Sequence, residues 1–402
     1  MKRSLVAIIL LSVLLALCAC GGKTGPAAME SLSPTPTTAP TPEQSAAEKA
    51  LAAMSTDEKI GQLFMIRPES LDPNLTPAQV HNAEQYGATE VSDAMAATLK
   101  EYPAGGIAVF SKNISSPAQL TSFVAALQNA SATPLIMGID EEGGSVARIG
   151  NSKSFDVPKY GSMGKIGATG DTENAGNVGY TIGSYLKKYG FTLDFAPVAD
   201  VNTNPHNIVI GNRAFGSDPE LVAGMVSAEI DGLHRAGIMS CAKHFPGHGD
   251  TMGDTHDGYV SVTKTWEELK NCELIPFVAA MKAGTDMIMA AHITAVNVTD
   301  DGLPASLSKE LITDKLRGEL GYKGVIITDS MGMGAIENKY SSADAAVKAI
   351  LAGADVVLMP MDYRAAFEGV RKAVEDGTIS EKRLDESVLR ILNLKEQYGI
   401  LK

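Results

Sequence analysis

Eight short apolar runs, each separated from the next by a segment with helical features, constrain the fold of this chain more than any other feature. The runs are residues 61–66, 104–110, 134–140, 193–198, 238–245, 287–293, 324–330 and 355–360. They lack a polar face, which is typical of parallel strands that helices cover on both sides. Eight strand and helix alternations across residues 47–402 predict an α/β protein whose single catalytic domain is a (β/α)8 TIM-type barrel.

Two segments between these runs begin and end as helices do. Ser116, Pro117 and Gln119 combine a helix N-cap, a proline at the first helical position and a capping-box partner. Ser308 is expected to cap another helix, which stops at Gly321. The competing doubly wound sheet needs a glycine-rich phosphate loop after its first strand, and the sequence has none there. The barrel is therefore the preferred fold.

The N-terminus predicts export and a lipid anchor. A basic start at residues 1–3 precedes an apolar run at 4–17, which is too short to span a bilayer. The following LCACGG sequence resembles a bacterial lipobox, so residues 1–19 are the expected signal peptide and Cys20 the lipidated residue. The alternative is an ordinary signal peptide with two incidental cysteines. The expected location is the outer face of the cytoplasmic membrane, in the cell envelope.

Composition limits the remaining possibilities. Residues 20–46 are rich in Pro, Thr, Ser and Ala, which indicates an extended, disordered linker after the lipidated cysteine. A formal charge of −13 without a basic block in the body argues against nucleic acid as a partner. Cys241, in a predicted strand, and Cys272, in a predicted helix, are expected to be buried free thiols, although an exported location permits a disulfide.

Polar residues stand where several apolar runs end. They are Asp140, Asp200 just beyond its run, Lys243, His244, His292 and Asp329. Active sites of (β/α)8 barrels lie at the carboxyl ends of the strands, so these side chains are expected to gather around one pocket. Taken singly, an aspartate after a strand is also a common helix N-cap.

The densest group of titratable residues lies at 243–256, in the sequence KHFPGHGDTMGDTH. His244, His248 and His256 could serve as metal ligands with the neighbouring aspartates. A lysine beside them and irregular spacing in a Gly/Pro loop favour instead a loop that carries a general acid/base. Asp254 could then accept a hydrogen bond from the imidazole of His256 and fix its tautomer.

These motifs resemble those of bacterial β-N-acetylhexosaminidases of glycoside hydrolase family 3. KHFPGHGDT followed by DTH is similar to the signature of that group. MSTDEKIGQLFM, GGIAVFSKNI, IDEEGGSVARI, DFAPVADVN, GNRAFG, GVIITDSMGM and AGADVVLMP resemble its successive strands and turns in order. The likeness covers roughly residues 47–402. The resemblance therefore implies the single-domain form, without the second, sandwich domain that many members carry after the barrel.

The resemblance assigns roles to individual residues. It implies that Asp329 is the nucleophile and that His256, assisted by Asp254, is the acid/base. It further implies that sugar hydroxyls are bound by Asp140, Arg148, Arg213, Lys243 and His244. For the two arginines the alternative is a structural salt bridge. Glu141 and Ser145 depart from the Gln and Arg that family members often carry, which affects substrate detail more than activity.

The implied activity is that of a retaining, exo-acting β-N-acetylglucosaminidase, which acts on peptidoglycan fragments or related glycans. No metal or organic cofactor is implied, and the oligomeric state stays open. Because the acid/base is a histidine, phosphate could compete with water as the acceptor. The alternatives are a β-glucosidase or β-xylosidase of the same family, a metal-dependent hydrolase on the same barrel, and a carbohydrate-binding lipoprotein without catalysis.

Overall fold

The computed structural model describes Gly22, Gly25 and residues 44–82 and 87–402. Its folded body runs from Gln44 to Lys402. The predicted signal peptide, Cys20 and almost all of the predicted linker lie outside the described residues. No helix in the described part of the chain is both long enough and apolar enough to cross a membrane.

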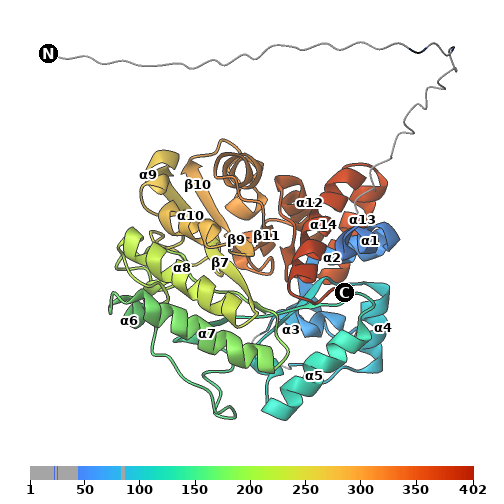
Figure 1. Cartoon of the computed structure of the whole chain (residues 1–402), viewed down its shortest axis with the longest axis horizontal. Coiled ribbons are helices and arrows are strands. Elements are labelled where there is room, and N and C mark those ends of the chain that lie inside the picture. Colours follow the sequence, from blue (N-terminus) through green and yellow to red (C-terminus); the bar gives the residue numbers. More distant parts are fainter. Residues whose placement is uncertain (1–21, 23–24, 26–43, 83–86) are drawn as a thin grey trace. The chain divides into compact units, whose positions relative to one another are not determined.

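Eight parallel strands form a barrel, as the sequence predicts (Figure 1). They are β1 (Phe64–Ile66), β2 (Gly106–Val109), β3 (Ile136–Ile139), β6 (Leu193–Asp194), β7 (Met239–Phe245), β9 (Met287–Ala290), β11 (Val325–Thr328) and β12 (Val357–Leu358). Each strand pairs with the next in chain order, and β12 pairs with β1. A parallel bridge between Ile327 and Val356 joins β11 to β12. The ring of eight strands is therefore nearly continuous.

Helices surround the barrel in sequence order (Figure 1). The α-helices are α1 (Ala46–Ala53), α2 (Thr56–Gln62), α3 (Pro77–His81), α4 (Asp93–Glu101), α5 (Pro117–Ala130), α6 (Met163–Gly167), α7 (Thr172–Lys188), α8 (Pro219–Arg235), α9 (Trp266–Lys270), α10 (Leu274–Lys282), α11 (Gly334–Glu337), α12 (Ser342–Ala352), α13 (Tyr363–Glu375) and α14 (Glu381–Gln397). Short 3-10 helices are η1 (Pro68–Leu71), η2 (Ser111–Asn113), η3 (Gly211–Arg213) and η4 (Ala305–Leu307). The Ser116 hydroxyl accepts the Gln119 N–H at the start of α5, as predicted.

Some predicted boundaries were wrong. Gly61 and Gln62 belong to α2 rather than to the first strand, because the capping box of Ser55 and Glu58 starts a helix that continues to residue 62. The helix predicted after Ser308 is a π-helix, η5 (Glu310–Glu319), although Ser308 does accept the Leu311 N–H. Cys241 is buried in β7, whereas Cys272 lies in a turn and is half-buried; both thiols are free.

Two strand pairs lie outside the barrel and were not predicted. β4 (Glu141–Gly143) and β5 (Val146–Ala147) form an antiparallel hairpin directly after β3. β8 (Val260–Thr265) and β10 (Ile293–Asn297) form a parallel pair after β7 and β9. Both pairs follow the carboxyl ends of barrel strands, so they extend the wall at the end of the barrel where the active site is expected.

A buried lysine on α14 gives the body a pH-dependent stability. Lys395 is fully buried and donates to the Gln62 Oε1 atom at 2.6 Å. Burial lowers the pKa of Lys395 from 10.5 to about 7. Between pH 7 and about 10 the unfolded chain binds this proton and the folded chain does not. The contribution of Lys395 to the free energy of unfolding therefore rises with pH across this window.

Burying the Lys395 ammonium at neutral pH lowers the free energy of unfolding, and replacing Lys395 by methionine together with Gln62 by leucine removes this penalty. We expect the free energy of unfolding at pH 7 to rise by about 2–4 kcal/mol and its pH dependence between pH 7 and 10 to flatten. Urea unfolding at several pH values measures both effects. Lys282→Met, at an exposed position of α10, is the control and should change neither. A double variant that keeps the pH slope of the parent would contradict the assignment.

Candidate active site

A cavity of about 300 Å³ opens at the carboxyl ends of the barrel strands. Its lining includes seven of the eight residues to which the family resemblance assigns roles: Asp140, Arg148, Arg213, Lys243, His244, His256 and Asp329. Asp254, the eighth, does not line the pocket, but its carboxylate contacts the Nδ1 atom of His256. Of the six strand-end residues that the sequence predicts to gather, Asp140, Lys243, His244 and Asp329 line this pocket, whereas Asp200 and His292 do not. The residues that line the pocket come from the last part of β7 and from the segments that follow β3, β6, β7 and β11, as the barrel rule requires.

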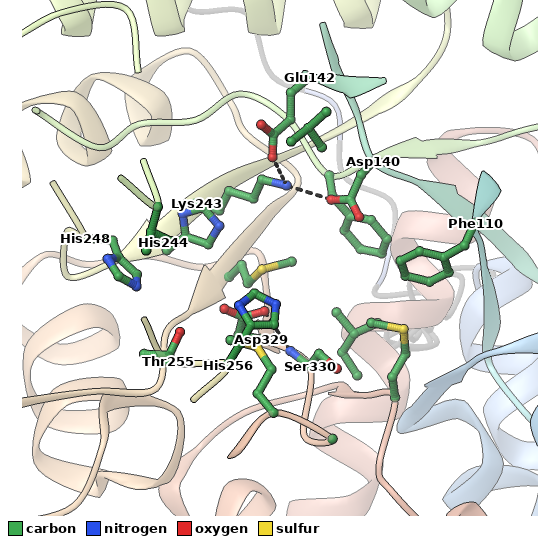
Figure 2. A pocket seen from close by; sticks show the side chains of 18 of the residues that line it. Phe110, Asp140, Glu142, Lys243, His244, His248, Thr255, His256, Asp329 and Ser330 are labelled. Atoms are coloured by element: carbon green, nitrogen blue, oxygen red, sulfur yellow. Dashed lines mark hydrogen bonds and ion pairs between the residues drawn. The ribbon is translucent and has the colours of Figure 1, made fainter. Parts of the chain in front are cut away.

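A chain of ion pairs forms one wall of this pocket. The Lys243 ammonium lies between two carboxylates, 2.7 Å from Asp140 Oδ1 and 2.6 Å from Glu142 Oε1 (Figure 2). Arg213 binds Glu142 through two hydrogen bonds of 2.9 and 2.7 Å. Arg148 reaches Asp140 Oδ2 at 3.2 Å. Each charged group thus has opposite charges as neighbours, which fixes its position in the pocket.

The ion pairs set the protonation states of this wall. Burial alone would raise the pKa of Asp140, but Lys243 and Arg148 outweigh it and hold that pKa below its usual range. Against the same effect of burial, Lys243 and Arg213 lower the pKa of Glu142 to about 2. The pKa of Lys243 is raised by the two carboxylates despite its burial. All these groups are therefore charged at neutral pH and can make charge-assisted hydrogen bonds to hydroxyl groups.

Asp200 positions two histidines beside this wall. Its Oδ2 atom accepts from His244 Nδ1 at 2.7 Å, and its Oδ1 atom accepts from the main-chain N–H of His248 at 2.6 Å. His244 Nε2, on the other side of the ring, lies 3.5 Å from Arg213 Nη2. Asp200 is fully buried and does not line the pocket, so it acts through the two histidines.

Asp329 directly follows β11 and reaches the pocket. The Ser330 N–H donates to Asp329 Oδ1 at 2.7 Å. Desolvation alone would raise the pKa of Asp329, but His292, His244 and this N–H together lower it. His292 is buried, and its Nε2 atom donates to the Ser330 carbonyl at 2.8 Å, which holds the turn after β11 in place. The Asp329 carboxylate is therefore ionised at neutral pH.

The loop after β7 carries the predicted carboxylate and imidazole pair. His256 Nδ1 lies 2.8 Å from Asp254 Oδ1, which also accepts the main-chain N–H of His256. Partial burial alone would raise the pKa of Asp254, but these two hydrogen bonds lower it. The His256 side chain is 68% exposed and lines the pocket. Its Nε2 atom is therefore available for proton transfer, while Nδ1 is held by the carboxylate.

Several lining residues were missed by the sequence analysis. Glu142, Arg67, His81 and Phe110 line the pocket, and Glu142 is the central acceptor of the ion-pair wall. Arg67 follows β1 directly and lies 4.0 Å above the Phe110 ring, which follows β2. The Nε atom of Arg67 is buried without a hydrogen-bond partner. The barrel rule, if applied to the first two strands, would have found both residues.

The two departures from the family pattern lie outside the pocket lining. Glu141 is buried, and its carboxylate accepts the N–H groups of Ile149 and Gly150 and the hydroxyl of Tyr185. These hydrogen bonds join the start of the β4–β5 hairpin to the residues that follow it and to Tyr185 on α7. Ser145 is exposed at the turn of that hairpin. Among the described residues, no group of three or more His, Cys, Asp or Glu side chains is arranged to hold a metal ion.

Known proteins are similar to this chain over most of its body. Residues 55–394 match the family described as the glycosyl hydrolase family 3 N terminal domain. The chain is 35% identical over 325 residues to beta-hexosaminidase A of Pseudoalteromonas piscicida, a match that covers 74% of this chain and 54% of that protein. It is 30% identical over 408 residues to beta-hexosaminidase LpqI of Mycobacterium tuberculosis, covering 98% and 97% of the two chains.

A solved structure of the same family is also similar to this chain. The structure of a glycoside hydrolase family 3 beta-N-acetylglucosaminidase from Paenibacillus sp. str. FPU-7 matches with a TM-score of 0.78 and 39% identity. The match covers 87% of this chain and 63% of that one. This chain therefore corresponds to about half to two thirds of the length of two of these three relatives, and to nearly all of the mycobacterial protein.

Proposed function

Because this chain belongs to glycoside hydrolase family 3, we propose that its pocket removes terminal β-linked N-acetylglucosamine from glycans, with retention of configuration. One observation carries this proposal. Asp329, which is ionised, and His256 line the same pocket, and Asp254 accepts a hydrogen bond from His256. The names of the similar hexosaminidases and the N-acetylglucosaminidase structure support the substrate class. A pocket of about 300 Å³ suits one terminal sugar, which supports exo action.

The proposed reaction has two displacements. Asp329 attacks C1 of the sugar while protonated His256 donates its Nε2 proton to the glycosidic oxygen, so the alcohol leaves and a glycosyl ester forms. Asp254 keeps Nδ1 as a donor and stabilises the imidazolium. Neutral His256 then takes a proton from water as the water attacks C1. The ester bond to Asp329 breaks, and β-N-acetylglucosamine is released.

The ion-pair wall orients the sugar in this scheme. Asp140, Lys243 and Arg213 present charged hydrogen-bonding groups on one side of the pocket, and the ring of His244 lies beside Arg213. Hydrogen bonds from charged groups are stronger than those between neutral groups, and their rigid arrangement holds C1 close to Asp329. Arg148, paired to Asp140, extends the same wall.

We further propose that the enzyme is anchored in the cell envelope. Cys20 is the proposed lipidation site, and residues 21–46 the tether between the lipid and the barrel. The lipobox-like sequence and the Pro/Thr-rich composition support this location. An enzyme held there meets wall fragments, so muropeptides are the proposed natural substrates. Metabolic labelling of the cells with a palmitate analogue tests the anchor; Cys20→Ala is expected to abolish the label.

The activity test compares two chromogenic substrates. We expect the body to release 4-nitrophenol from the β-N-acetylglucosaminide and not from the β-glucoside. The protein should begin at Gln44 or earlier, since Ser45 caps α1 and the N–H groups of Ala46 and Ala47 bind Glu396 on α14. Turnover of the glucoside alone would replace the proposal by a β-glucosidase. Turnover of neither would favour a carbohydrate-binding protein without catalysis.

A substitution at Arg67 tests sugar binding in the pocket and leaves the proposed reacting groups unchanged. The guanidinium of Arg67 lines the pocket and lies on Phe110, so its N–H groups can donate to a sugar hydroxyl. Arg67→Met is expected to raise KM for the 4-nitrophenyl substrate about tenfold, equivalent to one charged hydrogen bond, with kcat within about twofold. Arg67→Lys should recover part of the loss. A fall in kcat with unchanged KM would contradict a binding role.

A further inference from the structure

The hydrogen bonds of His256 do not fix this residue to the barrel. Its Nδ1 atom and its main-chain N–H both bind Asp254 Oδ1, two residues earlier in the same loop. The side chain of His256 is otherwise largely exposed. These bonds hold the two residues to each other, so the place of the imidazole depends on what the backbone of residues 254–256 contacts.

Two main-chain hydrogen bonds connect that backbone to the segment of the proposed nucleophile. The N–H of Gly334 donates to the His256 carbonyl at 3.1 Å, and the N–H of Ala335 donates to the Thr255 carbonyl at 3.1 Å. Gly334 is the first residue of α11 and lies five residues after Asp329. The proposed acid and the proposed nucleophile are thus joined through one short stretch of chain.

A side chain at position 334 would prevent this close approach. A Cβ atom there would lie 2.6 Å from the His256 carbonyl oxygen and 3.2 Å from the Asp257 carbonyl carbon. Non-bonded carbon atoms are normally about 3.5–4.0 Å apart, and backbone atoms cannot move away by a change of rotamer. Gly334 lacks the positive φ that would itself favour glycine, and glycine is a poor helix former. The contact with the loop therefore explains the glycine.

We propose that Gly334 is a positioning residue: without a side chain, it lets α11 dock the backbone of His256 and thereby sets the distance from the acid to Asp329. The inference rests on the proposed roles of His256 and Asp329. Protonation of the glycosidic oxygen needs His256 within hydrogen-bond reach. Attack by Asp329 does not, since that carboxylate directly follows β11. Loss of the docking contact should therefore slow the substrates whose leaving group must be protonated.

The test compares Gly334→Ala with Gly258→Ala on methyl and 4-nitrophenyl β-N-acetylglucosaminides. Gly258 lies on the same loop, but a Cβ atom there would meet nothing within 4 Å beyond its chain neighbours. Gly334→Ala is expected to lower kcat/KM for the methyl glycoside by about 10- to 100-fold, the effect of misplacing a reacting group by about 1 Å. For the 4-nitrophenyl glycoside kcat/KM should stay within about threefold of the parent. Gly258→Ala should leave both substrates within about twofold.

A double variant shows whether Gly334 acts through His256. Once His256 is replaced by alanine, the position of the loop no longer affects protonation. Gly334→Ala/His256→Ala should therefore match His256→Ala on the methyl glycoside within about twofold. Losses that multiply in the double variant would reveal an independent structural effect and would overturn the inference.

Hydrogen exchange followed by NMR tests the docking contact without relying on a stable variant. In the parent protein the amide protons of Gly334 and Ala335 should exchange at least about tenfold more slowly than in an unstructured chain. In Gly334→Ala the Ala335 amide should lose this protection, whereas the Thr328 amide, which donates to the Val356 carbonyl, should keep it. Unprotected Gly334 and Ala335 amides in the parent would contradict the docking contact.

The outcomes separate this inference from the proposed function. Equal losses on both glycosides in Gly334→Ala, or unchanged turnover of the methyl glycoside, would overturn the positioning role and leave the glycosidase intact. The same selectivity in Gly258→Ala would also overturn it, since the loop would then respond to any added methyl group. Failure of the parent to hydrolyse either glycoside would overturn the proposed function together with the inference.

Discussion

Replacing Asp329 by asparagine is expected to lower kcat/KM for the 4-nitrophenyl β-N-acetylglucosaminide by about 10⁴-fold or more. The amide has the same shape and can still accept the Ser330 N–H, but it cannot attack C1 as an anion. Asp140, Lys243 and Arg213 are untouched, so the variant should still bind N-acetylglucosamine. Calorimetric titration with that sugar shows whether the pocket is intact. A variant that keeps more than about a hundredth of the parental activity would contradict the nucleophile assignment.

A smaller substitution at the same position distinguishes a nucleophile from a structural residue. Asp329→Ala leaves space beside C1, and azide is an anion small enough to enter it. Azide should restore turnover of the activated aryl substrate and form the α-glycosyl azide, because it attacks from the face that Asp329 used. The product is identified by NMR. Absence of rescue at any azide concentration, with an intact pocket, would count against direct attack by Asp329.

Replacing His256 by alanine is expected to have an effect that depends on the leaving group. For a methyl glycoside kcat/KM should fall by about 10³-fold, because the alcohol must be protonated as it leaves. For the 4-nitrophenyl substrate kcat/KM should fall by less than about tenfold, since nitrophenolate leaves without a proton. Its kcat should fall further, because the second step has lost its base. Steady-state kinetics on both substrates measures these effects.

A neighbouring residue provides the control for this prediction. Asp257 is exposed on the same loop, one residue after His256, and it does not line the pocket. Asp257→Ala should leave both substrates within about twofold of the parent. Asp254→Asn should reproduce the selectivity of His256→Ala for poor leaving groups in weaker form, because the imidazole loses the carboxylate that orients it. Equal losses on both glycosides in His256→Ala would refute the acid/base role.

The barrel could be predicted from sequence because two-sided burial leaves apolar runs without a polar face. The lengths of the strands could not be predicted, because a strand ends where its neighbour ends or where a proline cannot donate a backbone hydrogen bond. β6 ends at Asp194, shortly before Pro197, which has no N–H for the ladder. β12 ends at Leu358; the chain then adopts φ +47° at Met359 and continues into Pro360. The β8–β10 pair joins segments from different strand-to-helix connections, which local periodicity cannot reveal.

The site was predicted where a motif or a strand end marked it. Glu142 was missed because it lies in a hairpin after the strand end, although Gly143 and Gly144, both with positive φ, are a turn signature. His81 was missed because its approach to the pocket depends on the fold of the long connection between β1 and β2. Its ring packs directly against Gly332, where a Cβ atom would clash with the ring. Such contacts between distant loops carry no local signature.

Covalent trapping tests the central claim most directly. A 5-fluoro-N-acetylglucosaminyl fluoride slows both displacements but retains a good leaving group, so the glycosyl ester should accumulate. Intact-mass analysis is expected to show one added fluorosugar per chain, and peptide mapping should place it on Asp329. The label should be absent from Asp329→Asn. A label on another carboxylate, or turnover without any covalent adduct, would contradict the proposed mechanism.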